Sequence, residues 1–402
     1  MNQTATINDR LEGLRKRYLL IGVVGVALLG TGLGLGLAGD DQMYDQFFRS
    51  YLFGYVFWLG IPLGALGILL LHNLVGGPWG YVTRRVLQAA VKTLPLMAIL
   101  FIPVILGMHS LYEWTHADFV AADPILRHKA PYLNESGFIM RAAAYFLIFI
   151  GFGWSIVRTM QRLEDLGGSV VTRRLQSVSA IGIILTFLAG TFAAFDWMMS
   201  LEPHWFSTAY GLLYMISGGL MTWAFLIIMM RRLSGVDPDV DEALRPGYIH
   251  DLGNFMFAFM LLWAYVSVSQ FIIIWSGNLP EETPWYLHRT AGAWKYFPIV
   301  LAVFHFAAPF GLLLSRKVKR DRGILARVAV LIILMHAIDL YWQIAPSFAH
   351  GDPGFHVSWL DGAALLGIGG IWLTIFAGIL GRGAFLPLNV AYPKQEAEHQ
   401  HV

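Results

Sequence analysis

The amino-acid sequence predicts an all-α integral membrane protein with ten transmembrane helices. Of its 402 residues, 56% are hydrophobic and only 13% are charged, whereas soluble domains have roughly 45–50% apolar and about 25% charged residues. The chain also contains ten apolar stretches of about 20 residues, the length that an α-helix needs to cross roughly 30 Å of hydrocarbon. An ordinary soluble domain is therefore not expected.

The apolar stretches define the expected spans and parts of the chain. The spans cover residues 18–39, 50–75, 86–110, 137–159, 176–200, 206–231, 249–277, 293–315, 323–345 and 358–381. The first follows a basic segment, as in a signal peptide, but its apolar run of about 22 residues exceeds the usual signal core of about 7–15. We therefore expect an N-terminus over 1–17, a ten-helix transmembrane domain over 18–381 and a polar tail over 382–402.

The distribution of basic residues predicts the orientation. Of 28 Lys and Arg residues, 21 fall on the side of the N-terminus, six fall on the opposite side, and Lys92 lies within a span. Basic loops resist translocation. Both termini are therefore expected in the cytoplasm, which agrees with an even number of spans.

The composition limits the chemistry that the chain can carry. Cysteine is absent, which excludes disulfides, thiolate zinc sites, cysteine-held iron–sulfur clusters and C-x-x-C-H attachment of haem c. A net charge of +2 gives no reason to expect a nucleic-acid partner. We expect no metal, no cofactor and no catalytic residue in this chain, and any redox centre would need histidines or another subunit.

The ninth span carries the clearest set of intramembrane polar residues. An ionisable group at mid-bilayer costs roughly 2.5–3.5 kcal/mol on insertion scales, so each one calls for a function or a structural partner. His336, Asp339 and Gln343 are three and four residues apart, which places them on one helical face. They are interpreted either as a proton relay or as a satisfied polar group that braces two helices.

His305 on the eighth span is predicted to lie at the depth of His336, so the two side chains can meet. Facing histidines can bind a b-type haem, which makes a membrane cytochrome one alternative. A haem-holding bundle usually has two such pairs or glycines opposite one pair. The sequence shows no second pair.

Further candidates lie towards both ends of the spans. Lys92 either extends its amine to the cytoplasmic surface or, with His72, forms an inner point of proton uptake. Asp196 lies about one turn inside the membrane at the end of span five, and Glu202 and His204 lie in the outward turn before span six. These three residues either lead protons to the outer water or cap the two helices. The complete set of proton-path candidates is His72, Lys92, Asp196, Glu202, His204, His305, His336 and Asp339.

Two segments resemble a known family. DWMMSLEPHWFSTAYG at 196–211 and GYIHDLGNFMFAFMLLWAYVSVSQFIIIWSGNLPEE at 247–282 are similar to the second large membrane subunit of bacterial alternative complex III. That complex is a quinol:cytochrome c oxidoreductase, and the subunit resembles the NrfD and polysulfide-reductase membrane-anchor family. The resemblance implies two four-helix bundles, spans two to five and six to nine, flanked by spans one and ten.

The resemblance also implies a location and partners. It places the chain in the bacterial cytoplasmic (inner) membrane with a sister membrane subunit, an iron–sulfur subunit and haem c subunits, and a terminal oxidase is a further partner that it allows. Menaquinone or another quinol, iron–sulfur clusters and haem c would then be bound by the partners, with quinol oxidised in the sister subunit. This chain would scaffold a respiratory complex and contribute a proton path, without being catalytic alone.

A proton-coupled secondary transporter is the main rival. Ten spans with ionisable groups at mid-membrane are typical of such carriers. Helices interrupted at matching positions in two inverted halves would support it. The prolines within the spans show no such paired pattern, and the two segments described above argue against it.

Overall fold

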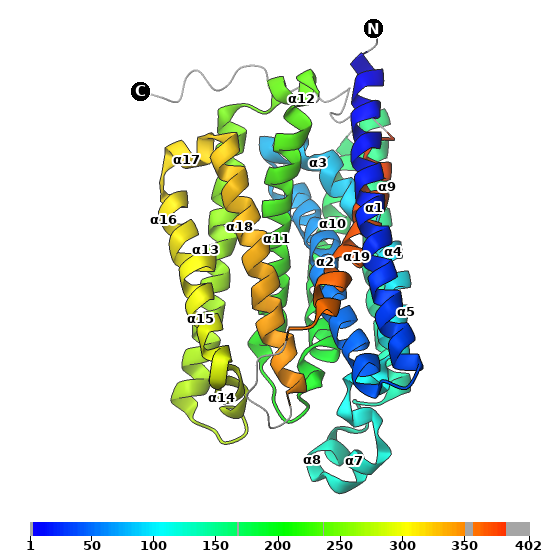
Figure 1. Cartoon of the computed structure of the whole chain (residues 1–402). Helices are drawn as coiled ribbons and strands as arrows, with labels where there is room; N and C mark the ends of the chain where they lie inside the picture. Colours follow the sequence, from blue (N-terminus) through cyan, green and yellow to red (C-terminus); the bar gives the residue numbers. More distant parts are fainter. Residues whose placement is uncertain (1–2, 167–168, 236, 350–356, 383–402) are drawn as a thin grey trace.

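The computed structural model describes residues 3–166, 169–235, 237–349 and 357–382, and their regular structure is entirely helical (Figure 1). Ten helical segments in these ranges are long and apolar enough to cross a membrane, which confirms the predicted all-α, polytopic fold. The chain is thus a multi-pass membrane protein. The spans consist of α1 (Gln3–Leu37), α2 (Asp41–Val75), α3 to α5 (Pro78–Val91, Leu94–Leu100, Ile102–Leu106), α9 (Glu135–Leu166), α10 (Ser169–Trp197), α11 (Thr208–Ser234), α13 (Pro246–Gly277), α15, η4 and α16 (Tyr296–Val300, Leu301–Ala307, Ala308–Leu314), α18 (Arg322–Ile344) and α19 (Trp359–Leu380).

Short helices connect the spans at both ends. They are α6 (Met108–Leu111), η1 (Glu113–Thr115), α7 (Ala117–Ala122), α8 (Pro124–Lys129), η2 (Met199–Leu201), α12 (Pro238–Ala243), α14 (Pro284–Thr290), η3 (Gly292–Lys295), α17 (Arg316–Arg320) and η5 (Ala345–Phe348). The predicted tail over 382–402 lies outside the described residues except for position 382.

The spans form two bundles that meet at α2 and α11. In the first bundle α2 packs against α3 and α10, and α9 packs against α10; in the second, α11 packs against α13 and α18, and α18 packs against η4. Helices α1 and α19 pack against each other and against α2, outside the two bundles (Figure 1). The expected arrangement of two four-helix bundles and two flanking helices is observed.

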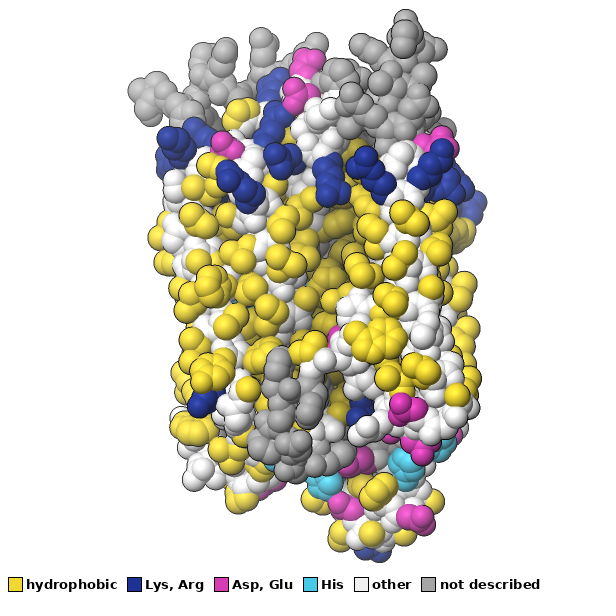
Figure 2. Space-filling view, viewed as in Figure 1, with side chains coloured by type: hydrophobic (Ala, Val, Ile, Leu, Met, Phe, Trp, Pro, Cys, Tyr) yellow, Lys and Arg dark blue, Asp and Glu magenta, His cyan; other side chains and the backbone are white. Residues whose placement is uncertain are grey.

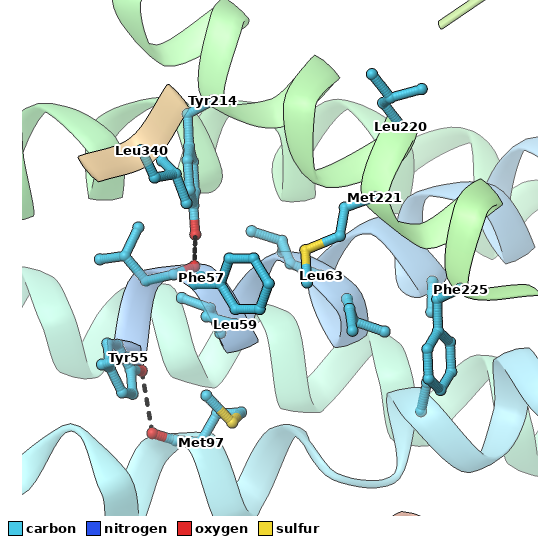
Figure 3. Close-up of a cluster of buried hydrophobic side chains, with 14 of the residues drawn as sticks. Tyr55, Phe57, Leu59, Leu63, Met97, Tyr214, Leu220, Met221, Phe225 and Leu340 are labelled. Carbon is cyan, nitrogen blue, oxygen red and sulfur yellow. Dashed lines mark hydrogen bonds between the residues drawn. The ribbon is translucent and has the colours of Figure 1, made fainter. Parts of the chain in front are cut away.

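Small residues allow α2 and α11 to approach closely. A Cβ added to Gly64 would lie 2.6 Å from the Gly218 carbonyl oxygen, so only glycine fits there. The Tyr214 hydroxyl, also on α11, donates to the Val56 carbonyl of α2 at 3.2 Å (Figure 3). The Gly60-x-x-x-Gly64 pair therefore joins two spans of this same chain.

Two helix interruptions shape the interior. The third span is divided into α3, α4 and α5 and contains Pro95 and Pro103. Proline interrupts a helix because it lacks an amide hydrogen and clashes with the preceding turn. Pro298 and Pro309 lie on either side of η4, a π-helix that carries His305. π-Helical turns inside α-helices are rare and often occur at functional sites.

The charged residues divide between the two ends of the molecule. Figure 2 shows Lys and Arg along the rim where α1 begins, and Asp, Glu and His gathered mainly around the opposite end. Helix α19 ends at the same rim at which α1 begins (Figure 1). We predict that this rim is cytoplasmic, because basic residues remain on that side of a membrane.

The orientation can be tested with reporter fusions. Fusions after residue 17, within Arg316–Arg320 and after residue 382 should report a cytoplasmic location, and a fusion within Pro124–Lys129 should report the opposite side. A fusion at any of the first three positions that reports an external location would contradict the predicted orientation.

Candidate functional site

A buried polar cluster lies in the middle of the second bundle. His305, His336 and Asp339 have relative exposures of 0%, 1% and 3%. The Trp263 ring of α13 lies against the His305 ring with 4.1 Å between centroids, and its indole Nε1 donates to Asp339 Oδ2 at 3.1 Å. His305 lies near enough to His336 for their charges to interact. This central cluster, His305, His336, Asp339 and Trp263, therefore joins spans seven, eight and nine, as the shared depth of the two histidines predicts.

The two histidines of the central cluster have unsatisfied ring nitrogens. Neither Nδ1 nor Nε2 of His305 or His336 has a hydrogen-bond partner among the described residues. The ring of His336 instead lies near that of Phe57, with 5.7 Å between centroids. Buried polar atoms nearly always have partners, so exceptions point to water or to a functional role.

A row of polar contacts connects the central cluster to the outer end of the bundle. Asp339 is hydrogen-bonded to the Gln343 side chain one turn further along α18. Arg289 of α14 is completely buried, and its Nη2 donates to the Gln343 carbonyl oxygen at 2.8 Å and lies 2.6 Å from Glu202 Oε1. The Ser347 hydroxyl donates to the same Glu202 oxygen at 2.8 Å. We call Asp339, Gln343, Arg289 and Glu202 the outer row.

The outer row ends at a cavity of about 670 Å³ on the side opposite the basic rim. Glu202, His204 and Ser347 line the cavity together with Trp205 and Trp285. Arg289 also stacks on Trp285, with its guanidinium carbon 3.9 Å from the ring centroid. The outer row thus leads from the membrane interior to a space large enough for water.

His204 lies at the rim of the outer cavity rather than in the row. Its Nε2 lies 2.5 Å from Asp123 Oδ2, which ties the segment after η2 to α8. The hydrogen bond from His204 lowers the pKa of Asp123. Of the three candidates between spans five and six, Glu202 is therefore the one that belongs to the outer row.

Asp196 lies in the first bundle, where it has a full set of partners. Arg141 of α9 donates to both carboxylate oxygens, from Nε at 2.7 Å and from Nη2 at 3.2 Å, and the Tyr145 hydroxyl donates at 2.8 Å. This forked pairing is among the strongest that an arginine makes. The geometry favours bracing of α9 against α10. Sequence reasoning missed this role because it counted Arg141 only among the six basic residues of the outer side.

The two inner candidates, His72 and Lys92, lie apart from the central cluster. The His72 ring is enclosed beside Trp79, at 4.8 Å between centroids, and its Nε2 lies 3.0 Å from the Gly77 carbonyl oxygen. Lys92 is exposed on the surface at the end of α3, which fits extension of its amine along the surface. The structure does not bring these two residues into the second bundle.

Sequence reasoning missed a polar group at the inner end of the second bundle. Lys319 Nζ donates to Asn254 Oδ1 at 2.7 Å, and Asn254 Nδ2 lies 3.2 Å from His250 Nδ1. Burial of Lys319 lowers its pKa. His250 Nε2 is buried without a hydrogen-bond partner among the described residues. The segment HDLGN lies in the second of the two segments that resemble a known family. Its i, i+4 spacing of His250 and Asn254 places the two on one face, which is the signal that could have identified them.

Comparison of the chain with models of known protein families and with curated protein sequences finds no match. Within the described ranges, no group of three or more His, Asp or Glu side chains is placed to hold a metal ion. The function is therefore argued from the geometry of the second bundle and from the resemblance of the two segments.

Proposed function

We propose that the chain is an integral membrane subunit of a bacterial respiratory oxidoreductase that transfers electrons from quinol to cytochrome c or another high-potential acceptor. It scaffolds the complex in the cytoplasmic membrane and contributes a proton path through its second bundle. The observation that supports the path is the central cluster continued by the outer row, which leads from mid-membrane to the outer cavity.

The chemistry of these side chains suits proton movement. Carboxylates and imidazoles inside a bundle are the groups that membrane proton relays use, and the ring nitrogens of His305 and His336 have no other hydrogen-bond partner in the described part of the chain. Arg289 supplies a fixed positive charge between Gln343 and Glu202. On the inner side, we assign proton uptake to His250, Asn254 and Lys319 rather than to the alternative pair His72 and Lys92.

The electron-transfer role is assigned to partners. The chain has no cysteine, so iron–sulfur clusters and haem c would be bound by other subunits. The resemblance suggests that quinol is oxidised in a sister membrane subunit beside the iron–sulfur protein. The two bundles and the flanking helices α1 and α19 would then give those subunits a membrane scaffold.

Mild detergent extraction tests the proposed assembly. We expect the chain to co-purify with a second polytopic subunit, an iron–sulfur protein and haem c proteins, and the preparation to reduce cytochrome c with quinol. A chain that purifies alone and moves a solute into proteoliposomes would contradict this proposal and favour a proton-coupled carrier.

The isolated subunit should have no b-type haem spectrum. A b-type haem in this chain would need His305 and His336 as its ligands, and we assign this pair to proton movement. A reduced-minus-oxidised spectrum of the subunit expressed without partners checks this. Haem bands that disappear in His305→Ala or His336→Ala would show that the pair binds haem instead.

A further inference from the structure

Two adjoining cavities lie between α2, α18 and α19, and the first of them shares Trp294 and Ala349 with the outer cavity. The first has a volume of about 510 Å³ and is lined by polar residues near the start of α2; the second has a volume of about 440 Å³ and an apolar lining. They share the residues Phe53, Tyr341, Val357 and Asp361. In the face shown in Figure 2, the surface between α18 and α19 is hollowed and its walls are hydrophobic.

The polar cavity contains a partly exposed cation, since the side chain of Arg49 is 29% exposed. Arg49 lies there with its guanidinium 5.0 Å from the Phe348 ring centroid and 3.5 Å from the Asp45 carboxylate, and its Nε has no hydrogen-bond partner among the described residues. Asp40 also lines this cavity and caps the start of α2, where its Oδ1 accepts from the Met43 backbone amide at 3.0 Å. The guanidinium of Arg49 reaches back along α2 to Asp45, and Asp40 lies five residues before Asp45. At about 1.5 Å per residue, Asp40 is therefore roughly 7 Å from Asp45 along the helix axis. The cavity therefore presents a positive and a negative group in sequence.

The buried carboxylate between the cavities is already satisfied. Asp361 accepts from the Ser50 hydroxyl at 2.6 Å and from the Ser358 backbone amide at 3.0 Å, and it is also hydrogen-bonded to Tyr341. These bonds tie the start of α19 to α2 and α18. Among the described lining residues, the charged groups that a ligand can still contact are therefore Arg49, beside Asp45, and the second carboxylate oxygen of Asp40.

The apolar cavity is a slot between spans two, eight, nine and ten. Phe297 and Val300 line it from α15, Ile338 from α18, and Leu365 from α19. Gly362 has no side chain and leaves one wall as bare backbone. A Cβ at this position would meet no atom within 4 Å, so the space beside it is open. The slot suits a chain of methylene groups, which gain free energy when apolar surface is removed from water.

We propose that the two cavities together bind one zwitterionic phospholipid, with its phosphate at Arg49, its ammonium group towards Asp40 and one acyl chain in the slot. The order of polarity along the cavities is that of a lipid molecule, from a charged headgroup to a hydrocarbon chain. Arginine is well suited to phosphate because its planar fork donates two parallel hydrogen bonds. A neutral isoprenoid quinone could accept a hydrogen bond from Arg49 but would leave both charges unpaired, and an anionic lipid would leave Asp40 without a counter-charge.

Native mass spectrometry of the delipidated protein tests the site. We expect one phosphatidylethanolamine to bind more tightly than phosphatidylglycerol or menaquinone. Arg49→Gln should weaken its binding about tenfold, as expected for loss of a hydrogen bond between charged groups. Gly362→Leu should weaken it similarly by filling the slot, without a backbone clash at the new Cβ.

Matched variants control for loss of charge and gain of bulk. Arg127→Gln removes an exposed arginine from the same end of the molecule, and Gly34→Leu adds the same side chain at an exposed glycine of α1 whose Cβ would also meet nothing within 4 Å. Both should bind the lipid as the parent does. If Arg49→Gln does not fold, Gly362→Leu decides. Parental binding by Gly362→Leu, or tighter binding of menaquinone than of phosphatidylethanolamine, would overturn the proposal.

Discussion

Replacement of Arg289 by leucine should destabilise the protein by about 3 kcal/mol, the lower end of the cost of removing one partner of a buried ion pair, because the Glu202 side chain is 20% exposed. Arg289 is completely buried, lies 2.6 Å from Glu202 and donates to the Gln343 carbonyl oxygen at 2.8 Å. Its loss leaves a carboxylate without its counter-charge and a carbonyl without its donor. Denaturant or thermal unfolding of the protein in mild detergent measures the change.

A second substitution separates the stability lost with the ion pair from the other effects of Arg289→Leu. Glu202→Gln in the Arg289→Leu background removes the stranded charge, so the double variant should be less destabilised than the sum of the two single variants. Arg127→Leu, at an exposed arginine, should change stability by less than about 0.5 kcal/mol. Equal stabilities of Arg289→Leu and Arg127→Leu would show that the buried pair does not hold the outer end of the bundle together.

Hydropathy and helical spacing were sufficient to predict the spans and the core of the site. Each span needs its own run of apolar residues, so its position is written locally in the sequence. His336, Asp339 and Gln343 share a face because their spacing follows the helical repeat. Helical spacing gave no reason to single out Trp263, since an indole on an apolar helix looks like ordinary core.

The partners of the buried charges could not be predicted, because they depend on how distant segments pack. Asp196 and its partner Arg141 are 55 residues apart, and Arg289 is assigned by sequence to an outer loop although α14 packs so that it becomes completely buried. The polar group at the inner end of the second bundle could not be predicted for the same reason. Lys319 is one of several lysines and arginines in a basic loop, and only packing against α13 places it on Asn254.

Replacement of Asp339 by asparagine in the assembled complex should abolish most proton translocation while electron transfer continues. In the parent protein Trp263 Nε1 donates to the Asp339 carboxylate at 3.1 Å. Asparagine keeps the size of the side chain and an oxygen that can accept this hydrogen bond, but it cannot take up and release a proton. Loss of a positioned proton-transfer group slows such a step by about 100-fold or more. We expect quinol:cytochrome c activity near that of the parent, with protons moved per electron falling towards the number that quinol oxidation releases directly. The measurement uses complex reconstituted in proteoliposomes with an internal pH dye.

Asp361→Asn is the matched control for this prediction, because it also removes a buried carboxylate from a membrane span. Asp361 bonds to Ser50 and caps the start of α19, away from the second bundle's polar row. Its replacement should leave the ratio of protons to electrons unchanged. If the Asp339→Asn complex moves as many protons per electron as the parent, Asp339 is not a relay. If that variant instead fails to assemble while Asp361→Asn assembles, Asp339 acts as a brace between α13 and α18, since its bond to Trp263 would then be needed to hold the helices together.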